Sequence, residues 1–254
     1  MRVEFNIPEL NSMKKYPKDM FYKGNLELLK KEKISIIGTR RPSSYTKLLT
    51  ARISSQLSAR GVCIVSGAAM GVDSISHQTA GANNTIAVMA NGLDIKYPSV
   101  NKTIITNIEK EGLTLSQFEE GFRATPWSFV VRNEVVVSLG NFLIVTEADL
   151  KSGSMRSVEF ALKMGKKIYV LPHRVGESEG TNYLLKNNSA TAIYDVEEFC
   201  SKFGSTCKQI SDDFLEYCKT NPNYEDAIKK FGDKVFEYEL ESKIKIINNV
   251  ISTI

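Results

Sequence analysis

Three times along this chain, a short apolar run leads into a turn of small and hydroxyl-bearing residues, and a helical stretch follows. The runs begin near Ile34, Val62 and Phe142. Strand–turn–helix units of this kind pack as parallel strands, so the unpaired N–H groups of the three helix starts gather at the carboxyl edge of one sheet. Open α/β sheets bind their ligands at that edge. Because two of the turns carry Arg or Lys, the sequence predicts an anionic ligand, and phosphate fits best.

The whole first part of the chain alternates between strand and helix patterns. Strands are predicted over 33–38, 62–66, 85–90, 113–117, 142–146, 167–171 and 191–194, and helices over 45–60, 70–81, 99–111, 128–140, 152–165 and 181–187. The first six strands are β-branched, apolar runs typical of strands buried on both faces. This alternation predicts an α/β fold with a doubly wound, mostly parallel sheet.

Two further segments flank this region. Residues 1–32 are predicted to form a short helical lead-in, and 33–205 the main domain. After Ser205 the pattern predicts helices over 212–219, 224–231 and 234–240, then two short strands around Asn248 and Asn249. Three helices and a hairpin over 206–254 are typical of a small winged-helix-like module. The alternative is a helical tail folded onto the main domain.

Charge is distributed unevenly between these parts. From Thr206 onward the chain has seven lysines and nine acidic residues, a net charge of −2. Because the whole chain carries +4, residues 1–205 carry +6. A polyanion is therefore expected to bind the first 205 residues.

Cysteine and histidine content argue against metal chemistry. The four cysteines contain no C-x-x-C pair, and there are two histidines. We expect a reduced, cytoplasmic protein without a metal centre. No apolar run reaches membrane-spanning length and the first residues lack a signal-peptide core, so no membrane partner is expected.

The turns do not match the common nucleotide-binding motifs. The first turn, which starts at Gly38, lacks the second and third glycines of the dinucleotide fingerprint, and the second strand ends in Ser66 and Gly67 rather than an acidic residue. No G-x-x-x-x-G-K-[ST] motif occurs. The sequence therefore predicts no nucleotide cofactor.

The same turns offer a distributed surface for phosphates. Arg40 and Arg41 follow the first strand, where guanidinium groups can fork onto phosphate oxygens. Ser43 can cap the next helix or donate to a phosphate. Ser66 and Gly67 permit close backbone approach, and the fifth strand is followed by Lys151, Ser152, Gly153 and Ser154 at a helix start.

A fourth segment adds aromatic rings to the cations. Trp127 and Phe129 stand beside Arg132 and Asn133, an arrangement that suits bases stacked on rings with phosphates held by arginine. The alternative is that the rings pack into the core, which we favour for Trp127 and leave open for Phe129.

Catalytic signatures are weak. There is no G-x-S-x-G motif, and Glu147 and Asp149 at a strand end are explained as well by orienting Arg or Lys as by catalysis. His77 is expected to be a packed or surface residue. We therefore expect a protein that is not an enzyme.

Taken in order, the motifs resemble the DNA-processing protein A (DprA/Smf) family. The similarity runs from about Lys33 to Phe199. It rests on IGTRRPSSY (37–45), VSGAAMGVDSISHQTA (65–80), MANGLDIKYPSVN (89–101), FVVRNEVVVSLG (129–140), TEADLKSGSMRSVEFALKMGKKIYVLP (146–172) and GTNYLLKNNSA (180–190).

This resemblance implies an extended Rossmann-like domain that binds single-stranded DNA without strong sequence preference. It also implies homodimers, protection of incoming single strands, and loading of the RecA recombinase during natural transformation. Arg40 matches the family's phosphate-gripping arginine. Residues 151–154 match its K-S-G-S loop, and Phe129, Arg132 and Asn133 match its F-x-x-R-N segment.

Some positions depart from the family pattern. Val130 replaces a proline and Glu134 a second arginine, which removes a cation from the F-x-x-R-N segment. The acidic balance of 206–254 favours a protein contact over DNA reading. The rival interpretation is a nucleotide-processing Rossmann-like enzyme that hydrolyses nucleoside monophosphates with Glu159, although the chain lacks that group's P-G-G-x-G-T signature. A third is an interaction scaffold with a vestigial pocket.

Overall fold

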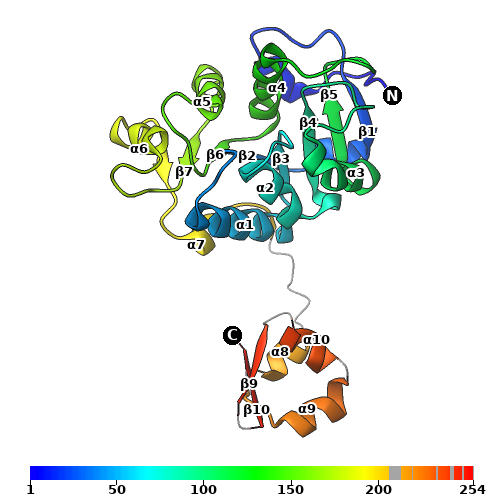
Figure 1. Ribbon diagram of the computed structural model, residues 1–254, viewed down its shortest axis with the longest axis vertical. Helices are drawn as coiled ribbons and strands as arrows, with labels where there is room; N and C mark the ends of the chain where they lie inside the picture. Colours follow the sequence, from blue (N-terminus) through cyan, green and yellow to red (C-terminus); the bar gives the residue numbers. More distant parts are fainter. Residues whose placement is uncertain (206–212, 219, 233, 241–242, 248, 254) are drawn as a thin grey trace. The chain divides into compact units, whose positions relative to one another are not determined.

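The computed structural model describes residues 1–205, 213–218, 220–232, 234–240, 243–247 and 249–253. The chain divides into two compact units, Met1–Ser205 and Thr206–Ile254 (Figure 1). Each is described here by itself.

The first unit is built on an eight-stranded sheet with the strand order β1-β5-β4-β3-β2-β6-β7-β8. All neighbouring strands run parallel except β1 and β5, which are antiparallel. The strands are β1 (Phe21–Gly24), β2 (Lys33–Ile37), β3 (Cys63–Ser66), β4 (Thr85–Met89), β5 (Leu113–Ser116), β6 (Leu143–Val145), β7 (Ile168–Val170) and β8 (Thr191–Ala192).

Helices cover both faces of this sheet (Figure 1). They are α1 (Ser44–Ala59), α2 (Val72–Ala80), α3 (Lys102–Glu111), α4 (Pro126–Leu139), α5 (Gly153–Lys163), α6 (Glu179–Lys186) and α7 (Val196–Ser201), with short 3-10 helices η1 (Pro8–Ser12), η2 (Leu26–Lys30), η3 (Ala82–Asn84) and η4 (Ser99–Asn101). The α/β fold with a doubly wound, mostly parallel sheet is confirmed. All seven predicted strands and all six predicted helices of this region are present, whereas β1 and α7 were not predicted.

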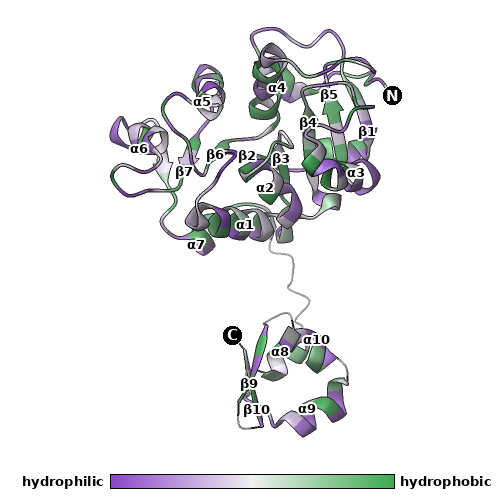
Figure 2. Cartoon of the chain, viewed as in Figure 1, coloured by the Kyte–Doolittle hydropathy of each residue, from purple (hydrophilic) through white to green (hydrophobic). Residues whose placement is uncertain are grey.

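Alternation along the strands divides the core between the two faces. Ile34 and Ile36 of β2 pack with Ile53 of α1 on one face, whereas Val65 of β3 packs with Val135 of α4 on the other. Successive side chains of a strand point to opposite faces, so strands that are apolar throughout can only be covered on both. In Figure 2 the strand β5 is coloured largely hydrophobic and the helix α6 is largely hydrophilic.

Residues 1–32 belong to the same unit as the sheet. Ile7 and Leu10 are fully buried in its core, and the Lys33 ammonium pairs with the Glu9 carboxylate at 2.6 Å. The predicted helical lead-in consists of the two short 3-10 helices η1 and η2, with β1 between them. The sequence did not reveal β1 because its four residues show no alternation of buried and exposed positions.

The order of the strands creates a switch point beside β2. From β2 the chain moves outward through β3, β4 and β5 on one side, then returns to place β6, β7 and β8 on the other. The loops that follow β2 and β6 therefore leave the carboxyl edge in different directions. Ligands of doubly wound sheets bind in the crevice between two such loops.

The described residues of the second unit form three helices and a hairpin. They are α8 (Asp213–Cys218), α9 (Tyr224–Phe231), α10 (Lys234–Leu240), β9 (Ile244–Ile247) and β10 (Val250–Thr253), the last two antiparallel. Phe214 lies at the centre of its core, packed with Val235 and Ile251 among others. This element order is the predicted one, although positions 212, 219 and 248 lie outside the described residues. The winged-helix-like assignment stays a prediction.

Three expectations from the sequence concern membrane-spanning helices, cysteines and metal ligands. Over the residues described, no helix combines the length and apolarity needed to cross a bilayer. Cys63 and Cys200 are buried free thiols and Cys218 is buried, while Cys207 lies outside the described residues. The part of the chain that the structure describes contains no group of three or more His, Cys, Asp or Glu residues arranged for a metal ion.

Candidate functional site

A cleft of about 610 Å³ lies at the switch point. Its walls come from the loops after β2, β3 and β6 and from the first turns of α4 and α5. The lining residues are Ile37, Gly38, Thr39, Arg40, Arg41, Ala69, Asp73, Pro126, Phe129, Val130, Arg132, Asn133, Glu147, Asp149, Ser152, Gly153, Ser154, Arg156 and Ser157. The structure thus brings together residues from all four of the motif regions identified in the sequence.

The loop after β2 supplies the cations of the first wall. Gly38 is required there because a Cβ would lie 2.6 Å from Val72 Cγ2 and 3.1 Å from the Glu147 carbonyl oxygen. The Thr39 N–H donates to that same carbonyl at 2.9 Å, which ties the β2 loop to the β6 loop. Arg40 and Arg41 are exposed, and no ion pair involves either of them within the described residues. Both guanidinium groups remain available to an anion.

The start of α4 supplies an aromatic ring to the opposite wall. Thr125 and Ser128 form a capping box that fixes where α4 begins. Phe129 is half-buried, and the guanidinium carbons of Arg40 and Arg132 lie 5.5 and 5.8 Å from its ring centroid. Of the two alternatives for Phe129, the structure gives a ring that lines the cleft.

Trp127 does not pack into the core, so that expectation is wrong. Its side chain is 63% exposed, and its ring touches Phe118 edge-on at a centroid distance of 5.9 Å. Positions two apart on a helix point in very different directions, so Trp127 and Phe129 cannot share one face of α4. Trp127 is not among the residues that line the cleft.

Arg132 anchors the cleft wall. The residue is 4% exposed, and its Nη1 donates to the Val88 carbonyl at 3.0 Å and to the Gly67 carbonyl. Burial lowers the pKa of Arg132, and the nearby Asp73 carboxylate opposes that shift. The guanidinium joins α4 to the ends of β3 and β4, which makes Arg132 a positioning residue rather than a free ligand for phosphate.

The loop after β3 is shaped around this guanidinium. A Cβ on Gly67 would overlap Arg132 Nη1 and Cζ, so only glycine fits. The N–H groups of Gly67 and Ala69 donate to Asp73 Oδ2 at 3.2 and 3.3 Å. Burial raises the pKa of Asp73, while the Arg132 charge and the Ala69 hydrogen bond act in the opposite direction. Ser66 is fully buried and donates to the Ile36 carbonyl at 2.6 Å, so the structure contradicts its expected place at the ligand surface.

The loop after β6 and the start of α5 form an anion seat. The Ser154 hydroxyl donates to the Gly38 carbonyl at 2.9 Å, which holds the start of α5 beside the β2 loop. Ser152 occupies the N-cap position, yet its buried hydroxyl makes no hydrogen bond to any described residue. Gly153 leaves open space where a side chain would be. The first N–H groups of α5 are therefore uncovered by any side-chain cap, as an anion site at a helix start requires.

Two sequence candidates lie beside the cleft rather than in its lining. Ser43 caps α1, since its hydroxyl accepts from the Thr46 N–H at 3.2 Å, and Glu147 Oε2 accepts from its N–H and its hydroxyl at 3.0 Å each. Capping, the default interpretation of Ser43 from the sequence, is thus what the structure shows. Lys151 is exposed next to the α5 start but is not among the lining residues. Asn133 lines the cleft and is half-buried.

Sequence reasoning missed two residues of the site. Arg156 lines the cleft from the first turn of α5 and forms an exposed ion pair with Glu159 at 3.5 Å. Its position one turn after the Lys-Ser-Gly-Ser run was a usable signal. Tyr97 follows β4, and its ring centroid lies 5.9 Å from that of Phe129. Nothing local in the sequence distinguishes Tyr97 from an ordinary loop residue.

The candidates for catalysis are engaged elsewhere. His77 is buried, its Nδ1 lies 2.7 Å from Thr85 Oγ1, and burial lowers its pKa to about 3. Of the two alternatives expected for His77, a packed or a surface residue, the structure shows the packed one. Glu159 pairs with Arg156 and does not line the cleft.

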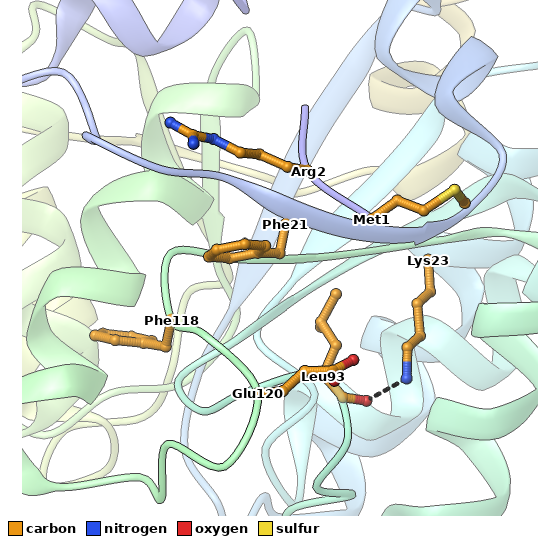
Figure 3. A pocket seen from close by; sticks show the side chains of 7 residues that line it. All are labelled: Met1, Arg2, Phe21, Lys23, Leu93, Phe118 and Glu120. Carbon is orange, nitrogen blue, oxygen red and sulfur yellow. Dashed lines mark hydrogen bonds between the residues drawn. The ribbon is translucent and has the colours of Figure 1, made fainter. Parts of the chain in front are cut away.

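A second hollow, of about 300 Å³, lies at the β1 edge of the sheet (Figure 3). The Lys23 ammonium there donates to the Leu93 carbonyl at 2.9 Å, and Arg2 pairs with Asp19 at 2.5 Å. Glu120 adds an acidic group to the lining. Because its cations are already engaged, this hollow is a poorer anion site than the cleft at the switch point.

The first unit resembles known proteins over almost its whole length. Residues 4–204 match the family model described as DNA recombination-mediator protein A. The DNA processing protein DprA of Streptococcus pneumoniae is 34% identical over 185 residues, which cover 71% of this chain and 65% of that protein. The Smf protein of Escherichia coli is 32% identical over 200 residues, which cover 77% of this chain and 53% of that protein.

Solved structures of similar sequence share the fold. DNA processing protein A from Helicobacter pylori, studied for its single-stranded DNA binding mode, superposes with a TM-score of 0.78 at 38% identity, covering 80% of this chain and 94% of that one. DprA from Streptococcus pneumoniae gives a TM-score of 0.71 at 32% identity, covering 77% and 70%.

Proposed function

The chain belongs to the DNA recombination-mediator protein A family, and on that premise we propose that its cleft at the switch point binds single-stranded DNA. The observation that carries this proposal is the pairing of Arg40 with Phe129. An exposed, unpaired guanidinium stands 5.5 Å from the centroid of a half-buried ring at the ligand-binding edge of the sheet. A cation beside a ring suits a polymer that alternates phosphates with aromatic bases.

The phosphates would follow a basic path across the cleft. Arg40 and Arg41 stand on the β2 side, and Arg156 and the first N–H groups of α5 on the other. Arginine forks onto phosphate oxygens, and a helix start accepts an anion without a dedicated side chain. Contacts of this kind do not read sequence, so we propose binding with little sequence preference.

We propose that binding occurs without catalysis. Glu159, the acid that the rival hydrolase would use, does not line the cleft, and the buried His77 lies against Thr85. Incubation with nucleoside monophosphates should release no free base, and release of base above a no-protein control would overturn this part of the proposal.

The remaining roles are proposals that rest on family resemblance. We propose that the chain forms homodimers, protects incoming single strands in the cytoplasm and loads the RecA recombinase onto them during natural transformation. Sedimentation at micromolar concentration tests the dimer. RecA assembly on a strand coated with single-strand binding protein tests the loading, and assembly no faster than in the chain's absence contradicts it.

Fluorescence anisotropy with labelled single- and double-stranded oligonucleotides tests the central proposal. Single-strand binding should weaken as salt rises, with a slope of log K against log salt of roughly −0.7 per phosphate contacted. Binding that is insensitive to salt, or equal for both forms of DNA, contradicts it.

A further inference from the structure

Three exposed lysines stand on a short segment, residues 13–18, that precedes β1. Lys14, Lys15 and Lys18 are exposed, whereas Met13 and Pro17 of the same segment are buried. None of the three lysines forms an ion pair with any residue that the structure describes. The apolar residues therefore hold the segment against the first unit, while the three ammonium groups face solvent.

Hydrogen bonds fix this segment along α4. The Lys14 N–H donates to Glu134 Oε1 at 3.0 Å. One turn further along the helix, the Ser138 hydroxyl donates to the Glu9 carbonyl at 2.6 Å and lies 2.9 Å from the Ser12 hydroxyl. Figure 1 shows the first residues of the chain, in blue, beside α4. The backbone at Lys14 thus has a defined place on this helix, and that place does not depend on the lysine side chain.

That place lies one turn beyond the cleft at the switch point. Val130 lines the cleft from α4 and is 40% exposed. Glu134 follows Val130 by four residues, so the two side chains lie on the same face of the helix, about 6 Å apart along its axis. Lys14 and Lys15 therefore extend the α4 wall of the cleft outward. A strand that leaves the cleft along this wall passes beside them.

The carboxylates near the segment do not neutralise its lysines. Both acidic residues between positions 9 and 19 are engaged in ion pairs, Glu9 with Lys33 at 2.6 Å and Asp19 with Arg2 at 2.5 Å. Glu134 is half-buried, and its Oε1 already accepts a backbone N–H. The three lysines outnumber this carboxylate, so the end of the α4 wall is positively charged and attracts a polyanion.

The opposite way out of the cleft is less favourable for an anion. Glu147 and Asp149 line the cleft at the end of β6. Their carboxylates would repel phosphates that continue in that direction. A strand held at Arg40 is therefore directed along α4, toward Lys14 and Lys15.

We propose that Lys14 and Lys15 bind backbone phosphates of a strand that continues out of the cleft along α4. This inference rests on the proposed single-strand binding and lengthens its site, because it adds residues ahead of β1 to those at the sheet edge. Lysine contacts phosphates as a point charge and leaves the bases unread. The extension adds affinity without sequence preference, and only for strands long enough to reach it.

Strand length separates this extension from the cleft. Lys14→Ala/Lys15→Ala should bind an oligothymidylate of about 16 nucleotides roughly 10-fold more weakly than the natural chain at about 0.15 M salt, and the magnitude of the salt slope should fall by about 1.4, the loss of two phosphate contacts. An oligothymidylate of about 4 nucleotides, which occupies the cleft alone, should bind both proteins alike. Lys14→Arg/Lys15→Arg should retain the affinity for the longer strand, because guanidinium groups also bind phosphate. Fluorescence anisotropy measures all three.

Lys30→Ala/Lys110→Ala is the matched control. Both of these lysines are exposed, and they precede β2 and β5 at the amino edge of the sheet, opposite the cleft. The control removes the same number of charges and should leave the binding of both strands nearly unchanged. An equal loss of affinity in the two double variants overturns the extension, because net charge alone would then explain it.

Acetylation of the natural chain tests the extension without any variant. Lys14 and Lys15 are exposed and should react with acetic anhydride, as should Lys30 and Lys110. The longer strand should protect Lys14 and Lys15 alone, and the shorter strand should protect none of the four, as read by mass spectrometry. Unchanged reactivity of Lys14 and Lys15 under a saturating amount of the longer strand overturns the extension.

The outcomes separate this inference from the proposed function. Salt-sensitive binding of the longer strand that is equal in the natural chain and in Lys14→Ala/Lys15→Ala overturns the extension and leaves binding in the cleft intact. A loss of the same size for both strand lengths also overturns it, since the two lysines would then not act beyond the cleft. If the natural chain binds neither strand, the proposed function and the extension fail together.

Discussion

The guanidinium carbon of Arg40 lies 5.5 Å from the ring centroid of Phe129, although the two residues come from opposite walls of the cleft. Arg40 follows β2 and Phe129 lies in the first turn of α4. The two residues lie close together because of the strand order. After β5 the chain crosses back over β2 through α4 and then enters β6 on the other side of β2. A phosphate at Arg40 would therefore have a stacking surface for its own base within reach.

Removing the ring of Phe129 tests that stacking surface. Phe129→Ala should weaken single-strand binding by about 1–3 kcal/mol, the usual contribution of one stacked base. Phe129→Tyr should retain most of the affinity. Trp127→Ala, two positions away and outside the cleft lining, is the matched control and should change binding little. Equal losses of single-strand affinity in Phe129→Ala and Trp127→Ala would contradict the assignment of Phe129 as the stacking surface. Fluorescence anisotropy at fixed salt provides the measurement.

Adding one methyl group at Gly67 tests the anchoring of Arg132. In Gly67→Ala the new Cβ overlaps the guanidinium, so the chain must shift or expel a buried cation. We expect a loss of unfolding free energy of about 1–3 kcal/mol, typical of overpacking. Gly153→Ala is the control, because a Cβ there meets no neighbouring atom. Urea denaturation of both variants measures the difference in unfolding free energy. Equal stability of the two variants would contradict the role of Arg132 as an anchor of the cleft wall.

Buried His77 predicts a stability that depends on pH. Its pKa is lowered from 6.5 to about 3 by burial, so between these values the unfolded chain binds a proton that the folded chain does not. The contribution of neutral His77 is complete above pH 6.5 and is lost as the pH falls toward 3, by about 1.4 kcal/mol per pH unit. The urea concentration at the midpoint of unfolding should fall when the pH is lowered from 7 to 5. This fall should be smaller in His77→Gln than in the natural chain. An equal fall in His77→Gln and in the natural chain would contradict this origin of the pH dependence.

The central strands were predictable because the signal for each of them lies within its own few residues. Every residue of β2, β3 and β4 is buried, and such runs are readable as apolar, β-branched stretches. The β1 strand was not predictable, because its pairing with β5 is a long-range event that three half-buried residues and an exposed glycine do not signal. The same limit applies to α7, whose six residues are short for a periodic pattern.

The location of the candidate site was easier to predict than the role of each side chain in it. Arg40, Phe129 and the Ser152–Ser154 turn were found because cations, rings and helix starts stand at strand ends. Ser66 and Arg132 have the same local appearance, yet the Ser66 hydroxyl and the Arg132 Nη1 donate to backbone carbonyls of neighbouring strands. Whether a polar side chain faces a ligand or a carbonyl depends on the packing of distant segments, which residue type alone does not encode.

The most direct test of single-strand binding in this cleft compares Arg40→Ala with Arg52→Ala over a range of salt concentrations. Both residues are exposed arginines, but Arg52 lies on α1 and pairs with Glu197, outside the cleft lining. Arg40→Ala should weaken binding alike for all sequences and reduce the magnitude of the salt slope by about 0.7, the loss of one phosphate contact. Arg52→Ala should leave both quantities nearly unchanged. An Arg40→Ala variant with the affinity and salt slope of the natural chain would contradict the account.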